Sequence, residues 1–277
     1  MRLGIFAKTF PGNEPHIVLS AASLSGYAAV QYNMACSGIP SLPQRISGKD
    51  VAAVRRAAKE AGIEIAAVSA TYNMIDPIDE RRLAGRKSFA AIAVAAHEMG
   101  SKLVTVCTGS RDPADQWRHH PDNATQSSWD EMCREFDLLL PIAKSEDIVI
   151  GVEPELANVV SSAEKARKLL DTFRSRHIGI VLDAANLFET ATLEKQNVIV
   201  SEAISVLGPS IVMAHAKDRT QDGGFTAAGH GVIDWRHYLS ELQTHGFDGP
   251  LVTHGLEAQD APEVATFLSG HISALEA

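Results

Sequence analysis

Eight short apolar runs, each followed by a stretch with helical periodicity, set the strongest limit on how this chain can fold. The runs begin near residues 3, 28, 63, 103, 148, 178, 211 and 250, so they are spaced roughly as single strand–helix units. Eight such units are the count of a (β/α)₈ barrel, in which parallel strands close into a ring inside a ring of helices. We therefore predict an α/β fold, a (β/α)₈ TIM barrel that spans residues 1–277 as a single domain.

Local signals give boundaries to these units. Asp50 is expected to cap a helix that starts at Val51, and Gly62 is expected to end it. The seventh run, Ile211–Ala214, is followed by a loop rich in glycine and polar residues over 219–231. A doubly wound open sheet also alternates strands and helices, but the G-x-G-x-x-G motif that such a sheet carries after its first strand is missing. The barrel is the better prediction.

Composition excludes several classes of protein. A hydrophobic content of 45% and a charged content of 21% are typical of a soluble globular domain. The formal net charge of −9 argues against a nucleic-acid partner, which requires clusters of Lys and Arg. No stretch approaches the roughly 20 apolar residues of a membrane helix, and Met1–Lys8 is typical of a strand rather than a signal peptide. The three widely spaced cysteines, without a CxxC motif, indicate reduced thiols of a cytoplasmic protein.

Four consecutive runs end on residue types that bind metals. The run Ile148–Val152 is followed by Glu153, and the next three runs end at Asp183, His215 and His254. In a barrel the carboxyl ends of the strands all face one mouth, so these side chains are expected to converge. Two carboxylates and two imidazoles suit a divalent ion of the Mn²⁺, Zn²⁺, Co²⁺ or Fe²⁺ type better than Ca²⁺, which prefers oxygen ligands.

Each of these four residues also has a simpler interpretation. A lone Glu or Asp after a strand is more often a helix cap or a salt-bridge partner, and a lone His at a strand end is more often a hydrogen-bonded wall residue. Four in succession, at the same place in four consecutive units, are much harder to obtain by accident. The recurrence therefore favours one metal site made by all four.

Motifs around these residues resemble those of a known family. Glu153 lies in Val-Glu-Pro, Asp183 in Leu-Asp-Ala-Ala-Asn and His215 in His-Ala-Lys-Asp. Residues 229–235 read Gly-His-Gly-Val-Ile-Asp-Trp. With these motifs the chain resembles the xylose-isomerase-like barrels, which hold the sugar phosphate isomerases and epimerases and, more distantly, the apurinic-site endonucleases. The motifs are moderately specific to that superfamily and say little about the substrate.

The resemblance implies a single divalent metal bound by Glu, Asp, His and Glu at the ends of strands five to eight. Mn²⁺ is the first expectation, with Zn²⁺, Co²⁺, Mg²⁺ and Fe²⁺ as alternatives. The first three ligands correspond to Glu153, Asp183 and His215, whereas His254 stands in place of the last glutamate. This replacement argues against the symmetric two-glutamate proton exchange of ketose epimerases. Glu257 lies three residues further on, which would put it on the other face of the strand, so it ranks below His254.

The resemblance also marks positions that contact a substrate. Asn186 stands where many relatives place a substrate-contacting histidine, and Glu155 replaces another common histidine. The pocket is therefore expected to recognise a polar substrate that differs from those of the best-known members. Lys217 could add positive charge beside the metal ligand, although an ion pair with Asp218 is equally compatible with the sequence.

Loop residues supply further candidates for substrate binding. Arg111, His120 and Arg219 are loop cations that could hold a phosphate or a carboxylate, although each such residue more often lies on the surface. Trp117 and Trp235 could wall the pocket, but packing beneath a loop is the more common role for such aromatic residues.

These groups suit proton transfer at a carbon next to a carbonyl. The metal would chelate the carbonyl and the adjacent hydroxyl and stabilise the developing ene-diolate. Glu153 would be a ligand and the base, and His254 a ligand or the partner acid. We therefore predict a metal-dependent isomerase or epimerase of a small sugar, sugar acid or sugar phosphate. Its expected partner is a carbohydrate rather than a nucleic acid or a membrane. The sequence is also compatible with a homo-oligomer.

Three other functions are compatible with the sequence. A metal-dependent lyase or dehydratase on the same barrel would use the same ene-diolate but expel a leaving group. A hydrolase of the apurinic-site endonuclease type would need several metals, more histidine ligands and a basic surface, so the charge of −9 and Asn186 argue against it. A non-catalytic sugar-binding barrel would result if the replacement at His254 abolished turnover.

Overall fold

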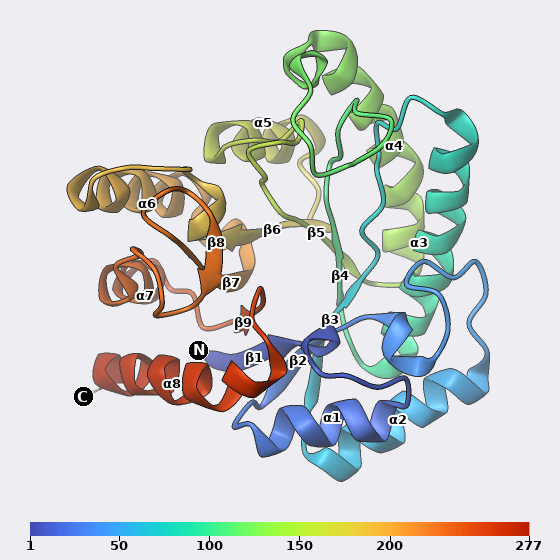
Figure 1. The fold of residues 1–277 in the computed structure, drawn as a ribbon. Helices are drawn as coiled ribbons and strands as arrows, with labels where there is room; N and C mark the ends of the chain where they lie inside the picture. The colour runs from blue at the N-terminus through green and yellow to red at the C-terminus, as the bar shows by residue number, and fades with distance from the viewer. Residues whose placement is uncertain (277) are drawn as a thin grey trace.

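Eight parallel strands close into a ring, and the helices surround it (Figure 1). This computed structural model describes residues 1–276. The barrel strands are β1 (Arg2–Phe6), β2 (Ala29–Tyr32), β3 (Glu64–Ser69), β4 (Leu103–Val106), β5 (Val149–Val152), β6 (Ile178–Asp183), β7 (Ile211–Arg219) and β9 (Pro250–Thr253). Each pairs in parallel with its neighbour in this order, and β9 pairs with β1 to close the ring. The predicted (β/α)₈ barrel is confirmed.

In the described residues 1–276, eight α-helices follow the strands and cover the outside of the ring. They are α1 (Pro15–Leu24), α2 (Gly48–Ala61), α3 (Asp79–Met99), α4 (Gln126–Ser145), α5 (Ala163–Phe173), α6 (Leu193–Leu207), α7 (Trp235–Thr244) and α8 (Ala261–Glu276). Among residues 1–276, no helix combines the length and the apolar character needed to cross a membrane.

The start of α2 differs from the sequence prediction. Ser47 rather than Asp50 is the N-cap residue, and the helix begins at Gly48. Asp50 occupies the third helical position, where its carboxylate accepts a hydrogen bond from the Ser47 backbone while the Ser47 hydroxyl accepts one from the Asp50 backbone. This reciprocal pair is a capping box, which a single acidic residue before an apolar run does not reveal. Gly62 ends the helix in the left-handed conformation, as expected.

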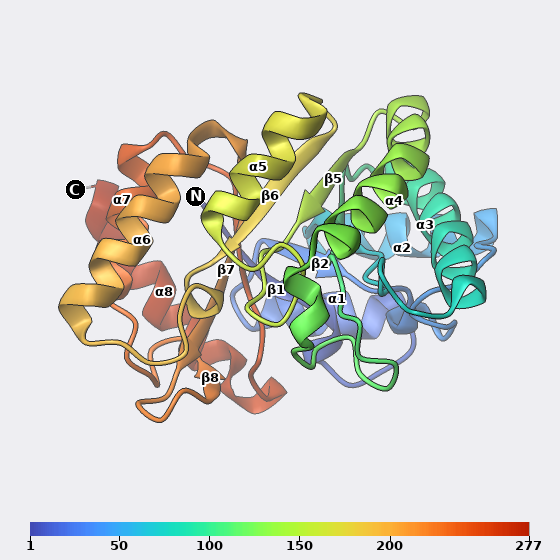
Figure 2. The same cartoon turned by 90° about the horizontal axis from the view of Figure 1, so that it is seen from above.

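The seventh strand is longer than predicted. It continues through His215 to Arg219 and turns back as a hairpin, because β8 (Phe225–Ala227) pairs antiparallel with its second half. The sequence predicted a loop there, since glycine and polar residues give no strand periodicity. The hairpin projects at the same end of the barrel as the loop between β4 and α4 (Figure 2).

A small apolar plug fills the barrel and sets the level of the site. It consists of Ala67, Leu103, Val181, Met213 and Val252. Because side chains alternate along a strand, the residue two places after an inward residue also points inward, one layer nearer the carboxyl end. The plug residues Val181, Met213 and Val252 lie two residues before Asp183, His215 and His254, respectively. The same spacing relates Gly151 to Glu153, and a Cβ at Gly151 would lie 2.8 Å from the Cδ1 of Leu103.

Candidate metal centre and active site

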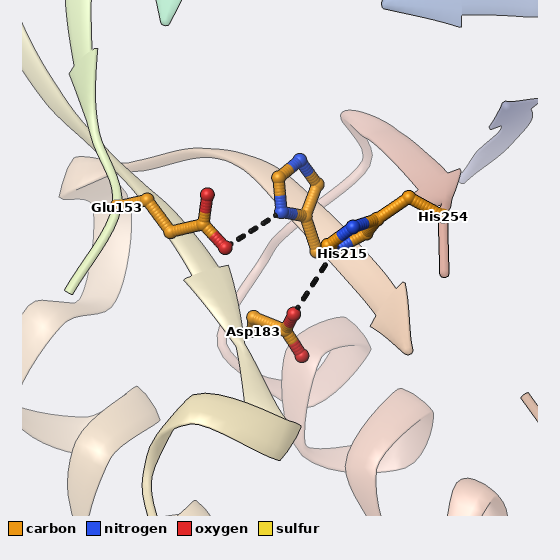
Figure 3. A group of neighbouring side chains, drawn as sticks. All are labelled: Glu153, Asp183, His215 and His254. Atoms are coloured by element: carbon orange, nitrogen blue, oxygen red, sulfur yellow. Dashed lines mark hydrogen bonds and ion pairs between the residues drawn. The ribbon is translucent and has the colours of Figure 1, made fainter. Parts of the chain in front are cut away.

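The four predicted ligands meet directly above the plug. Glu153 follows β5, Asp183 ends β6, His215 lies in β7 and His254 follows β9, and one ligand atom from each lies within 4.8 Å of all the others (Figure 3). Two opposite bonds of roughly 2.1 Å to one cation span about 4.2 Å, so this spacing is close to that of a single ion's shell. The predicted convergence of these four side chains is therefore present.

Each imidazole contacts one of the two carboxylates. His215 Nδ1 lies 3.0 Å from Glu153 Oε1, and His254 Nε2 lies 3.2 Å from Asp183 Oδ2. The two rings also pack against each other, with centroids 4.5 Å apart. Each carboxylate therefore faces a nitrogen that can bind either a proton or a metal.

Gln31 decides which nitrogen of His215 carries the proton. The Gln31 amide nitrogen donates to Thr105 Oγ1 at 3.0 Å, which leaves its Oε1 to accept from His215 Nε2 at 2.8 Å. In the neutral ring Nδ1 is then unprotonated, so its lone pair faces a Glu153 oxygen at 3.0 Å. Two acceptors at this distance repel unless a cation or a proton lies between them. The donor set of two carboxylates and two imidazoles therefore fits a divalent cation.

Lys217 and Asn186 organise the same carboxylates. The Lys217 ammonium lies 3.3 Å from Asp183 Oδ2 and donates to Asn186 Oδ1 at 2.9 Å. The Asn186 amide in turn donates to Glu153 Oε1 at 2.9 Å. Lys217 thus pairs with Asp183 rather than with Asp218, because consecutive residues of a strand point to opposite faces.

Both ligand carboxylates are held ionised. Burial works to raise the pKa of Glu153, but the nearby His215, His254 and Lys217 outweigh it and hold that pKa below its ordinary value. Burial of Asp183 is likewise opposed, first by Lys217 and then by His254, so its pKa also lies below the ordinary range. Burial and the neighbouring His215 lower the pKa of His254 and favour its neutral, metal-binding form.

Glu155 is the one acidic residue of the site whose pKa moves the other way. Burial, followed by repulsion from Glu153, raises its pKa to about 8, and Lys217 opposes the shift. Glu155 lines the same cavity as Glu153.

The centre lies at the floor of a cavity of about 650 Å³. The side chains of Glu153, Glu155, His215, Lys217, Arg219 and His254 all line this cavity. The Arg219 guanidinium is fixed by bonds from its Nε to the Ala185 carbonyl at 2.6 Å and from its Nη1 to the Gly223 carbonyl. A volume of this size is typical of small-molecule sites in proteins.

The structure places Arg111 and His120 outside this cavity. The Arg111 guanidinium donates to Ser128 Oγ at 3.0 Å and pairs with Glu131, so its charge is already compensated. His120 Nδ1 accepts from the backbone of Asp122 at 3.2 Å. Neither side chain is among those that line the cavity, although His119, the neighbour of His120, is. Glu257 is exposed, which agrees with the prediction that His254 is the better candidate for a metal ligand.

The two tryptophans have different roles. Trp235 is buried and donates to Asp218 at 2.9 Å beneath the loop that follows β8, in agreement with the more common role. Trp117 lines the cavity and is 49% exposed.

The sequence did not predict the cavity residues that lie at or just beyond the ends of the first three strands. These are Phe6, Lys8, Gln31, Asn33, Ser69 and Thr71, and Phe225 of the hairpin also belongs to the set. A signal existed for some of them, because Gln31 is a polar residue within an apolar strand and Asn33 follows that strand directly. In a barrel, polar residues at the carboxyl ends of the strands face the mouth. This expectation, which identified the candidate ligands after strands five to eight, also identifies these positions when it is applied to the first half of the barrel.

A family model described as xylose isomerase-like TIM barrel matches residues 19–269. The chain belongs to this family. The motifs around Glu153, Asp183 and His215 that gave the resemblance lie within the matched range. No match was found among curated protein sequences.

Solved structures with the same fold include several sugar epimerases. The 3-keto-D-glucoside 4-epimerase of E. coli is 17% identical, with a TM-score of 0.76 over 98% of this chain and 99% of that chain. A D-tagatose 3-epimerase-like protein is 17% identical, with a TM-score of 0.78 over 100% and 98%. An L-ribulose 3-epimerase is 14% identical, with a TM-score of 0.77 over 99% and 94%. At these identities the likeness establishes a shared fold.

Proposed function

We propose that this protein is a divalent-metal-dependent isomerase or epimerase that moves a proton at a carbon next to the carbonyl of a small sugar, sugar acid or sugar phosphate. The observation that carries the proposal is the meeting of Glu153, Asp183, His215 and His254 within 4.8 Å of one another at the floor of a cavity. The sugar epimerases among the similar structures support the same reaction class.

The four residues would hold the ion, and we infer Mn²⁺ first because carboxylates and imidazoles together suit ions of that type. When bound there, a divalent cation supplies Lewis acidity, which polarises the carbonyl and the neighbouring hydroxyl of the substrate. All remaining tasks fall to side chains of this chain.

Glu153 is the base in this proposal. It lines the cavity and is ionised, because His215, His254 and Lys217 together outweigh the effect of burial on its pKa. His254 lies within 4.8 Å of Glu153 in the same cluster, and its role is either that of a ligand or, where it does not bind the ion, that of the partner that returns a proton. The two groups are therefore chemically different, one a carboxylate and the other an imidazole.

Other residues bind and orient the sugar. Lys217 places a positive charge beside the reacting carbons, and Glu155, which lines the same cavity, can form a hydrogen bond with a substrate oxygen. Arg219 lines the cavity further out, where an anionic group of a sugar acid or a sugar phosphate would be bound. Asn186 keeps Glu153 and Lys217 in position.

Proton exchange with solvent tests this proposal directly. Protein loaded with Mn²⁺ is incubated in D₂O with a panel of ketoses, sugar acids and sugar phosphates, and the products are followed by NMR and mass spectrometry. We expect one carbon-bound deuterium next to the carbonyl, and we expect Glu153→Gln to abolish it while the exposed Glu257→Gln control leaves it unchanged.

Two results would redirect the proposal. A product lighter by one water would identify a lyase or dehydratase that uses the same residues. Metal-loaded protein that labels no member of the panel, and changes the mass of none, would overturn the proposed reaction.

A further inference from the structure

Tyr238 is a buried residue beside the metal centre that has no part in the proposed chemistry. It lies in α7, outside the ring of strands, and is 0% exposed. Its hydroxyl donates to the Leu182 carbonyl oxygen at 2.9 Å and lies 3.4 Å from the His215 carbonyl oxygen. The first of these peptide groups leads directly into Asp183 and the second follows His215. A single side chain therefore contacts the backbone on both sides of two candidate ligands.

The two strands that carry these ligands are paired irregularly. Asp183 and His215 lie opposite each other in the β6–β7 ladder, but the register shifts between Ile180 and Val181, just before the ligands. A shift of this kind disrupts the ladder locally and increases the twist of the strands. Metal–ligand bonds have narrow lengths of roughly 2.1 Å, so the relative position of the two strands decides how well both side chains reach one ion. The Tyr238 hydroxyl bridges the strands at this level.

The ring of Tyr238 is itself held in place by its neighbours. Trp235 lies three residues earlier on the same helix, and the two ring centroids are 6.0 Å apart. Trp235 Nε1 donates to Asp218 Oδ2 at 2.9 Å, and Asp218 lies on β7 three residues after His215. The first turn of α7 thus contacts β7 at two levels. This also gives a role to the motif at residues 229–235, which does not line the cavity.

We propose that Tyr238 is a positioning residue of the metal centre, whose hydroxyl fixes β6 and β7 relative to each other and thereby sets the geometry with which Asp183 and His215 bind the ion. The inference rests on the proposed function for the ion itself. Tyr238 does not line the cavity, so it acts through the backbone alone. Loss of its hydroxyl therefore changes the ligand geometry while all four ligands are still present.

Tyr238→Phe removes the hydroxyl and retains the ring, and Tyr32→Phe is the matched control. Tyr32 is also 0% exposed, and its hydroxyl lies 2.7 Å from Ser37 Oγ, on no strand that carries a candidate ligand. Mn²⁺ affinity is measured by calorimetry, and visible absorption of the Co²⁺ form reports the ligand geometry. We expect Tyr238→Phe to bind Mn²⁺ about tenfold more weakly and to shift the Co²⁺ bands, because residues that orient metal ligands contribute factors of this size. Tyr32→Phe should keep the wild-type affinity and spectrum although it also loses a buried hydrogen bond.

The outcomes separate this inference from the proposed function. Circular dichroism and melting temperatures verify that both variants are folded. The wild-type protein adds a reading without any variant, since the buried Tyr238 hydroxyl proton should give an NMR signal that shifts on addition of Zn²⁺. Equal Mn²⁺ affinity and identical Co²⁺ spectra in Tyr238→Phe and the wild type, with no shift of that proton, would refute the inference and leave the metal centre intact. Wild-type protein that binds no ion would overturn the proposed function and the inference together.

Discussion

Asp218 provides a quantitative test of how the hairpin beside the cavity is held. Its carboxylate is fully buried and accepts four hydrogen bonds. Oδ1 accepts from the backbone of Arg219 at 2.8 Å and of Ile233 at 3.0 Å, and Oδ2 accepts from the backbone of Gly229 at 3.0 Å and from Trp235 Nε1 at 2.9 Å. These bonds tie both ends of the segment that carries β8 to one side chain.

The substitution Asp218→Asn has a cost that follows from this geometry. Whichever oxygen becomes an amide nitrogen, two N–H donors then face another donor. A buried donor without an acceptor costs about 1–3 kcal/mol, so the loss of two bonds is expected to destabilise the protein by about 2–6 kcal/mol. This is a large share of the roughly 5–15 kcal/mol that stabilises a typical domain. At about 2–4 °C per kcal/mol, the melting temperature should fall by roughly 10 °C.

Urea unfolding followed by circular dichroism measures this effect. The matched control is Asp222→Asn, an exposed aspartate on the same hairpin, which should change stability by less than about 0.5 kcal/mol. We expect a lower midpoint for Asp218→Asn with an unchanged slope. If Asp218→Asn unfolds within about 0.5 kcal/mol of the wild-type protein, the argument from four buried hydrogen bonds is wrong.

Three further predictions follow from single contacts. Gln31→Leu should weaken metal binding about 10–100-fold in a calorimetric titration, because His215 loses the acceptor that fixes its tautomer; unchanged affinity would contradict this. Gly85→Ala should lower the melting temperature although alanine favours helices, because the new Cβ would lie 2.1 Å from the Tyr72 ring; a rise would contradict this. Under native conditions a thiol reagent should label Cys133 alone, since the other two cysteines are buried, and mass mapping of a second labelled site would contradict this.

The ring of strands and the four converging residues could be predicted because both depend on local periodicity. An apolar run that alternates inward and outward side chains places Asp183 two residues after Val181, and the same spacing holds for His215 and His254. Such a relation needs no knowledge of which other segments lie nearby. The metal-ligand types at these positions were therefore visible in the chain itself.

The remaining features depend on contacts between distant segments. The sequence predicts Arg111 as a cation for substrate binding, whereas in the structure its guanidinium contacts Glu131 and Ser128, and a sequence does not reveal that pairing. The extension of β7 into a hairpin likewise depends on Asp218, whose partners lie up to 17 residues away. Residues that act through tertiary hydrogen bonds of this kind become apparent only in the folded structure.

The metal content of the protein tests the central claim most directly. Wild-type protein, Glu153→Gln, His254→Ala and the control Glu257→Gln are dialysed against Mn²⁺, freed of loose ions and analysed by mass spectrometry for bound metal. We predict about one ion per chain for the wild type and the control, and a clear loss in the other two variants, because the ion is held by ligands from four strand ends and each variant removes one of them. Wild-type protein without bound metal, or equal metal content in Glu153→Gln, would contradict the account.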